Sequence, residues 1–136
     1  MKACHRLLLF LPLLFGPVGC KTPENTIPYR KIHFTVSVPS TDLINVGGYA
    51  YFTGGVQGVV VYRFDMQTFL AYDRACPHDW DKGGRVKMIN SVYLYDSLCG
   101  SMFNILDGAP VSGPAETPLR AYQTYLESEF SLRVFN

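Results

Sequence analysis

Short runs of alternating apolar and polar residues follow one another along much of the chain. Between residues 32 and 38, apolar side chains alternate with small or polar ones, which is typical of a half-buried β-strand. Residues 59–64 instead begin with three consecutive valines and continue with Tyr62, Arg63 and Phe64, a β-branched run of strand length that predicts a strand buried on both faces. Further strands are predicted, with glycine, proline or polar residues between them, over residues 49–53, 69–72, 85–88, 91–95, 120–126 and 130–135.

Turn signals separate these runs. Gly47-Gly48, Gly54-Gly55 and Gly83-Gly84 interrupt the apolar pattern, and Asp107-Gly108 is a strong signal for a tight turn. No segment combines a sustained helical period with capping residues. The pattern therefore predicts an all-β domain of small antiparallel sheets, with no internal repeat.

The amino terminus has the layout of a secretory signal. Lys2 and Arg6 precede an apolar run over residues 7–15, which is too short to cross a bilayer as a helix and is followed by small residues. We therefore expect residues 1–19 to be a signal peptide and the chain to be exported.

Cys20 directly follows a small residue at the end of this segment. That arrangement resembles the lipobox of bacterial lipoproteins, which implies a diacylated Cys20 and a membrane anchor. An ordinary cleaved signal and an uncleaved anchor are the alternatives. We expect residues 20–29 to form the lipidated cysteine and its tether, and residues 30–136 a single domain. The predicted location is the bacterial cell envelope, facing the periplasm or the exterior.

The net charge of the chain bears on whether it binds nucleic acid. The chain has 12 basic residues and 11 acidic ones, and two of the basic residues, Lys2 and Arg6, fall in the predicted signal. The remaining domain is near neutral and has no basic field of the kind that binds nucleic acid. We therefore expect no nucleic-acid partner, and we expect contact with the membrane only through the lipid.

Cysteine usage directs attention to one pair of thiols. Of the 4 cysteines, Cys4 lies in the predicted signal and Cys20 is the predicted lipidation site, so that the domain keeps Cys76 and Cys99. In an exported protein such a pair most often forms a disulfide. Here, however, other residues that bind metals stand beside both cysteines, namely His78 and Asp96.

The order of motifs around these residues resembles the Rieske iron-sulfur family. That family has a Cys-x-His motif, a gap, a Cys-x-x-His motif, and then a Gly-Ser-x-Phe-Asp segment, an Asp-Gly turn and a Gly-Pro-Ala loop. The corresponding segments in this chain are Cys76-Pro77-His78, Asp96-Ser97-Leu98-Cys99, Gly100-Ser101-Met102-Phe103-Asn104, Asp107-Gly108 and Gly113-Pro114-Ala115. The resemblance implies a Rieske-like fold with a loop-built cluster-binding subdomain.

The resemblance also implies a ligand set in which two of the four positions have changed. Matched to the family, Cys76 and Asp96 would share one iron of a 2Fe-2S cluster, and His78 and Cys99 would share the other. This set carries one more negative charge than the family's, which implies a lower reduction potential. The places of the disulfide found in some branches of the family are taken by Asp81 and Leu98.

Three states of the site remain open on the sequence. The first is a 2Fe-2S cluster held by Cys76, His78, Asp96 and Cys99. In the second the cluster is lost, and Cys76 and Cys99 form a disulfide that joins the two loops. In the third the same residues hold a single zinc or iron ion.

No motif of a catalytic site stands out beside these residues. The chain lacks a Gly-x-Ser-x-Gly elbow, a phosphate-binding loop and a His-Glu-x-x-His helix. We therefore expect an electron carrier rather than an enzyme, which docks transiently against an unidentified redox protein of the envelope. Without a cluster, the same fold would be a binding or structural lipoprotein.

Overall fold

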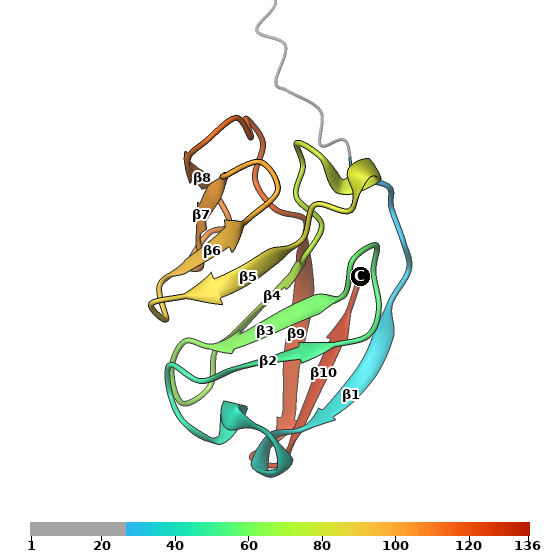
Figure 1. Cartoon of the computed structure of the whole chain (residues 1–136). Helices are drawn as coiled ribbons and strands as arrows, with labels where there is room; N and C mark the ends of the chain where they lie inside the picture. Colours follow the sequence, from blue (N-terminus) through green and yellow to red (C-terminus); the bar gives the residue numbers. More distant parts are fainter. Residues whose placement is uncertain (1–26) are drawn as a thin grey trace, which may run out of the picture.

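The computed structural model describes residues 27–136, so that the predicted signal peptide and Cys20 lie outside the described residues. Within this range the chain forms strands, three single-turn 3-10 helices and connecting loops (Figure 1). The strands are β1 (His33–Ser37), β2 (Tyr49–Phe52), β3 (Val59–Arg63), β4 (Phe69–Asp73), β5 (Val86–Ile89), β6 (Tyr93–Asp96), β7 (Met102–Asn104), β8 (Pro110–Ser112), β9 (Ala121–Ser128) and β10 (Ser131–Phe135). The helices are η1 (Val38–Ser40), η2 (Asp42–Ile44) and η3 (Trp80–Lys82).

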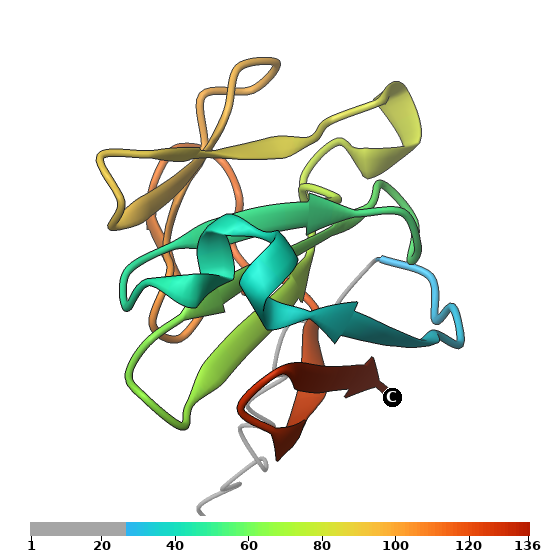
Figure 2. The ribbon, with the colours of Figure 1, turned by 90° about the horizontal axis from the view of Figure 1, so that it is seen from below.

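The strands form two sheets in which every pairing is antiparallel. The larger sheet has the order β1-β10-β9-β4-β3-β2, and the smaller one has the order β5-β6-β7-β8. The small sheet, yellow to orange in Figures 1 and 2, lies against one side of the larger sheet. The all-β prediction is therefore confirmed.

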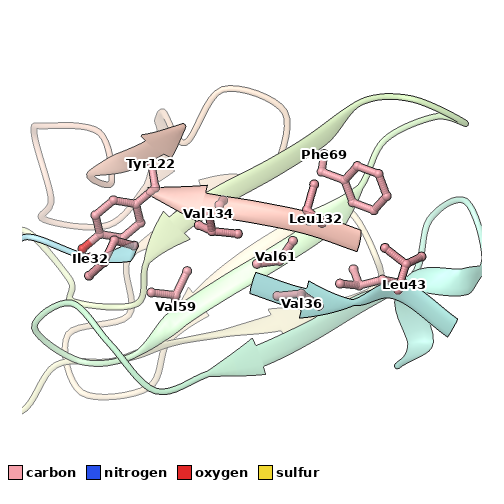
Figure 3. Close-up of a cluster of buried hydrophobic side chains, with 11 residues drawn as sticks. Ile32, Val36, Leu43, Val59, Val61, Phe69, Tyr122, Leu132 and Val134 are labelled. Carbon is pink, nitrogen blue, oxygen red and sulfur yellow. The ribbon is translucent and has the colours of Figure 1, made fainter. Parts of the chain in front are cut away.

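Strand β3 explains why three valines follow one another at residues 59–61. Val59 and Val61 point into a core enclosed by the larger sheet, where they meet Val36 of β1 and Leu132 and Val134 of β10 (Figure 3). Val60 points the opposite way, because side chains alternate along a strand, and packs in the core between the two sheets. All three valines are fully buried, as the sequence predicts.

The second core lies directly behind the predicted ligands. It joins Val60 and Tyr72 of the larger sheet to Val86, Leu94 and Phe103 of the smaller one. Cys76 is part of this core, and its own exposed fraction is 0%. The smaller sheet and the loops at its end are thus fixed to the larger sheet by apolar packing.

The strand boundaries of the small sheet differ from the sequence prediction. The predicted hairpin turned at residues 89–90, whereas β5 runs to Ile89 and its partner β6 begins at Tyr93, with Asn90 and Ser91 both at positive φ. Tyr93 and Tyr95 do lie on one face, since Leu94 between them is buried. Strands β7 and β8 were not predicted, because three residues are too few to display a period of two.

Asp73 anchors the start of the first ligand loop. Its side chain is fully buried and accepts hydrogen bonds from the backbone N–H groups of Val56, Gln57 and Ala75 and from the hydroxyl of Tyr122, at 2.6, 3.1, 2.9 and 2.7 Å. Ala75 immediately precedes Cys76, so that this carboxylate fixes the backbone next to the first cysteine.

We expect Asp73→Ala to lower the free energy of unfolding by about 3–5 kcal/mol, because four donors lose their acceptor in a buried position. Tyr122→Phe is the matched control: it removes one of the four bonds and should cost only about 1–2 kcal/mol. Urea unfolding of both variants measures the difference. Equal losses in the two variants would contradict the anchoring role of the carboxylate.

Candidate metal centre

Two connections bring the predicted ligands together at one end of the molecule. The first joins β4 to β5 over residues 74–85 and is seen in yellow-green at the top of Figure 1. The second joins β6 to β7 over residues 97–101. Because β5 and β6 are neighbours in the small sheet, both connections lie at the same end of it.

The first loop is held closed by backbone hydrogen bonds. The N–H of Cys76 donates to the carbonyl of Gly84, and the N–H of Gly84 donates to the carbonyl of Asp79. The N–H groups of Asp79 and Trp80 both donate to the carbonyl of Cys76, which produces a tight turn. This turn leaves Cys76 and Asp79 buried and His78 exposed.

The second loop is a turn that starts at the last residue of β6. The carboxylate of Asp96 accepts the N–H of Leu98 at 2.8 Å, and its backbone carbonyl accepts the N–H of Gly100. Gly100 has a φ of 80°, in the left-handed region that glycine adopts without strain. Cys99 is thereby turned back toward Asp96, with its sulfur 3.8 Å from Oδ2 of that residue.

The two loops place four possible metal ligands in one cluster. One donor atom from each of Cys76, Asp79, Asp96 and Cys99 lies within 4.8 Å of every other. The two sulfur atoms are 3.6 Å apart, and both cysteines are free thiols. A disulfide bond is about 2.05 Å long, so its formation would require the sulfurs to move together.

Three of the four residues that the sequence predicted as ligands are therefore brought together, and the fourth is not. Cys76, Asp96 and Cys99 belong to the cluster, whereas His78 lies exposed beside it. His78 lines an open depression of about 400 Å³ together with Asp79, Lys82, Leu98, Cys99 and Pro114. The role of His78 as a ligand stays a prediction.

Asp79 is the site residue that the sequence analysis missed. Its exposed fraction is 3%, and its Oδ1 atom has no hydrogen-bond partner among the described residues. A spacing signal was present: Cys76 and Asp79 are three residues apart, as are Asp96 and Cys99, and pairs at this separation are common in metal-binding loops.

Burial raises the pKa values of two groups in the cluster, the Cys76 thiol and the Asp79 carboxyl. Burial is the main cause that raises the pKa of the Cys76 thiol, only partly offset by the backbone N–H of His78. Burial also raises the pKa of the Asp79 carboxyl, and the neighbouring carboxyl of Asp96 raises it further. Burial therefore disfavours the ionised forms of both groups, and a cation bound between them would favour those forms.

Glycine and serine residues shape the space around the cluster. A Cβ atom at Gly84 would lie 1.9 Å from Oδ1 of Asp79 and 2.8 Å from Oδ2 of Asp96, so that only glycine leaves room for both carboxylates. The buried hydroxyl of Ser101 accepts from the Cys99 thiol and from the N–H of Ala115, both at 3.0 Å. It thereby joins the segment Gly113-Pro114-Ala115 to the second loop.

As they lie, the residues do not fit a 2Fe-2S cluster. Such a cluster would place Cys76 and Cys99 on different irons, with both irons and the bridging sulfides between them, yet their sulfurs are only 3.6 Å apart. His78 would also have to turn inward from its exposed position. The donor set itself is suited to metal, since thiolate, imidazole and carboxylate all bind iron and zinc.

Comparison with known proteins gives a match in structure only. No protein-family model matches the chain, and no curated protein matches it by sequence. A solved complex of reduced oxygenase and oxidised ferredoxin in carbazole 1,9a-dioxygenase contains a chain with 20% identity and a TM-score of 0.57, covering 78% of this chain and 94% of that one.

Two solved ferredoxins also share the fold. The ferredoxin of carbazole 1,9a-dioxygenase from Nocardioides aromaticivorans IC177 is 20% identical with a TM-score of 0.51, and the match covers 78% of this chain and 97% of that one. The Sphingomonas yanoikuyae B1 ferredoxin is 19% identical with a TM-score of 0.51, over 79% and 99% of the respective chains. The described domain therefore has the fold of Rieske-type ferredoxins, which confirms the fold that the sequence motifs implied.

Proposed function

We propose that this protein is a one-electron carrier of the bacterial cell envelope, with a metal centre between the two ligand loops. The observation that carries this proposal is the convergence of two cysteines and two aspartates at the loop-bearing end of a fold shared with ferredoxins. An exported thiol pair surrounded by carboxylates is suited to binding a metal ion. The carrier would act on no substrate of its own.

The position of the site suits electron exchange with a second protein. Cys99 is half-buried, and the open depression beside it is lined by His78, Leu98 and Pro114. Leu98 is 58% exposed, which provides an apolar contact next to the centre. A small contact of this kind is typical of transient redox complexes. We expect the partner to be a redox protein of the envelope.

The chemical form of the centre has more than one candidate. The 2Fe-2S cluster implied by the sequence resemblance, with Cys76, His78, Asp96 and Cys99 as ligands, would require the two loops to separate. When bound it would supply a one-electron couple. The alternative is a protein without a cluster that acts as a binding or structural module, closed by a Cys76–Cys99 disulfide or by a single metal ion.

A redox titration of the iron-loaded protein tests the proposed function. The full chain is expressed with iron, purified under anaerobic conditions and titrated while its visible and electron paramagnetic resonance spectra are recorded. An electron carrier gives one reversible step that transfers one electron and leaves the protein folded. Absence of any reversible step in protein that holds iron would contradict the proposal.

Envelope anchoring through Cys20 is the second part of the proposal. Within residues 27–136, no helix is long and apolar enough to cross a membrane. Lipid on Cys20 would attach the domain by its amino-terminal end, and two acyl chains suffice for stable binding. We expect Cys20→Ser to abolish incorporation of labelled palmitate and to release the protein from the membrane fraction, whereas Cys4→Ser should do neither. A Cys20→Ser variant that remains lipid-labelled would contradict this anchor.

A further inference from the structure

The four clustered side chains form a site that is different from the one expected on the sequence. Cys76, Asp79 and Asp96 have exposed fractions of 0%, 3% and 1%, and Cys99 is half-buried. Burying carboxylates and thiols together costs free energy unless a cation or hydrogen bonds compensate. Oδ1 of Asp79 has no such hydrogen bond within the described part of the chain.

The distances in the cluster correspond to one metal ion. Two thiolates bound at about 2.3 Å to a tetrahedral metal lie about 3.8 Å apart, and a thiolate and a carboxylate oxygen on the same metal lie about 3.6 Å apart. The observed separations are 3.6 Å between the two sulfurs and 3.8 Å between Sγ of Cys99 and Oδ2 of Asp96. These two separations match a single ion, and the remaining donor atoms from the two loops all lie within 4.8 Å of one another.

The loops present these ligands as two matching pairs. Cys76 and Asp79 come from the first loop at a three-residue separation, and Asp96 and Cys99 come from the second at the same separation. Structural zinc sites are commonly assembled from two such pairs on separate loops. Gly84 leaves the space between the pairs open, because the Cβ atom of any other residue there would clash with the carboxylates of Asp79 and Asp96.

We propose that Cys76, Asp79, Asp96 and Cys99 bind a single divalent first-row transition metal ion, Zn²⁺ or Fe²⁺, in a tetrahedral site with two sulfur and two oxygen ligands. Asp79 takes the place that His78 has in the ligand set implied by the family. Thiolate and carboxylate ligands with this geometry suit both ions. The inference rests on the proposed function only in placing a metal between the same two loops.

Cobalt titration of the full chain, reduced and free of metal and sulfide, tests the inference. Co²⁺ in a tetrahedral site with thiolate ligands gives intense charge-transfer and d–d absorption bands, which report geometry as well as binding. We expect one Co²⁺ per chain, displaced by Zn²⁺. We expect Asp79→Asn to weaken binding by about 100-fold or more. The matched control His78→Asn should leave the affinity within about twofold, as expected for an exposed residue that does not bind the metal.

A second readout distinguishes a ligand from a residue that only supports the fold. Asp79→Asn replaces a buried carboxyl, one oxygen of which has no hydrogen-bond partner among the described residues, by an amide of the same shape. The metal-free variant should therefore unfold at the same temperature as the unaltered protein or higher. The added stabilisation by Zn²⁺ should be lost. A variant that is unstable without metal would assign Asp79 a structural role and overturn the inference.

The remaining outcomes separate this inference from the proposed electron transfer. Iron and sulfide in a two-to-two ratio, lost in His78→Asn but kept in Asp79→Asn, would overturn the single-ion site and leave the electron carrier intact. Failure of the unaltered protein to bind Co²⁺ would also overturn the single-ion site. Binding of Zn²⁺ through Asp79, with no reversible redox step in the iron-loaded protein, would support the single-ion site and contradict the carrier.

Discussion

Replacing Cys76 by serine is expected to lower the affinity of the protein for metal by about 100-fold or more. Cys76 is the most deeply buried donor, and it lies in the apolar core between the two sheets. Serine has nearly the same shape, but its hydroxyl does not ionise near neutral pH and is a poor ligand for zinc or iron. Isothermal titration with Zn²⁺ under reducing conditions measures the loss.

The Cys76→Ser result has a control within the same chain. Cys4→Ser makes the same chemical change in the segment predicted to be removed as a signal peptide, and it should leave the affinity for metal unaltered. The Cys76→Ser protein should remain folded. The preceding residue, Ala75, is still held by its hydrogen bond to Asp73, and the apolar side chains of the core still surround residue 76. Unchanged metal binding by folded Cys76→Ser would mean that the centre lies elsewhere.

Gly84→Ala is expected to have the second largest effect on the site. The added methyl group would lie 1.9 Å from Oδ1 of Asp79 and 2.8 Å from Oδ2 of Asp96, so that one or both carboxylates must leave their present positions. Overpacking of this kind costs about 1–3 kcal/mol of stability. We expect the affinity for Zn²⁺ to fall by about tenfold or more, because the ligands lose their spacing.

The neighbouring glycine provides a sharp control for Gly84→Ala. Gly83 has a φ of 91°, and a Cβ atom there would meet nothing within 4 Å. Gly83→Ala should therefore cost about 1–2 kcal/mol of stability through backbone strain alone and leave metal binding unaltered. Equal metal affinities of the two variants, measured by the same titration, would contradict the assigned role of Gly84 in keeping the carboxylates apart.

The larger features of the fold could be predicted from the sequence because they depend on long patterns. The run of valines in β3 is buried from both sides, and the alternation in β1 and β9 follows one buried face. Strands β7 and β8 depend instead on pairing with β6 in the small sheet, and their own three residues carry no usable pattern. Tertiary contacts decide the structure of such short segments.

The candidate site could be predicted only where family motifs marked it. Cys76, Asp96 and Cys99 occupy motif positions, and the structure brings them together. Whether residue 78 or residue 79 faces the cluster depends on the turn after Cys76, which is set by two N–H groups that donate to one carbonyl. A sequence pattern does not contain that geometry, so that the pairing of Cys76 with Asp79 became visible only in three dimensions.

Metal and sulfide analysis of the full chain tests the central claim most directly. The protein is purified without oxygen from cells supplied with iron and zinc, next to the Cys76→Ser variant. The account predicts near-stoichiometric metal in the unaltered protein and its loss in the variant. Protein that contains a Cys76–Cys99 disulfide, and that takes up neither iron nor zinc after reduction, would contradict a metal centre in this fold.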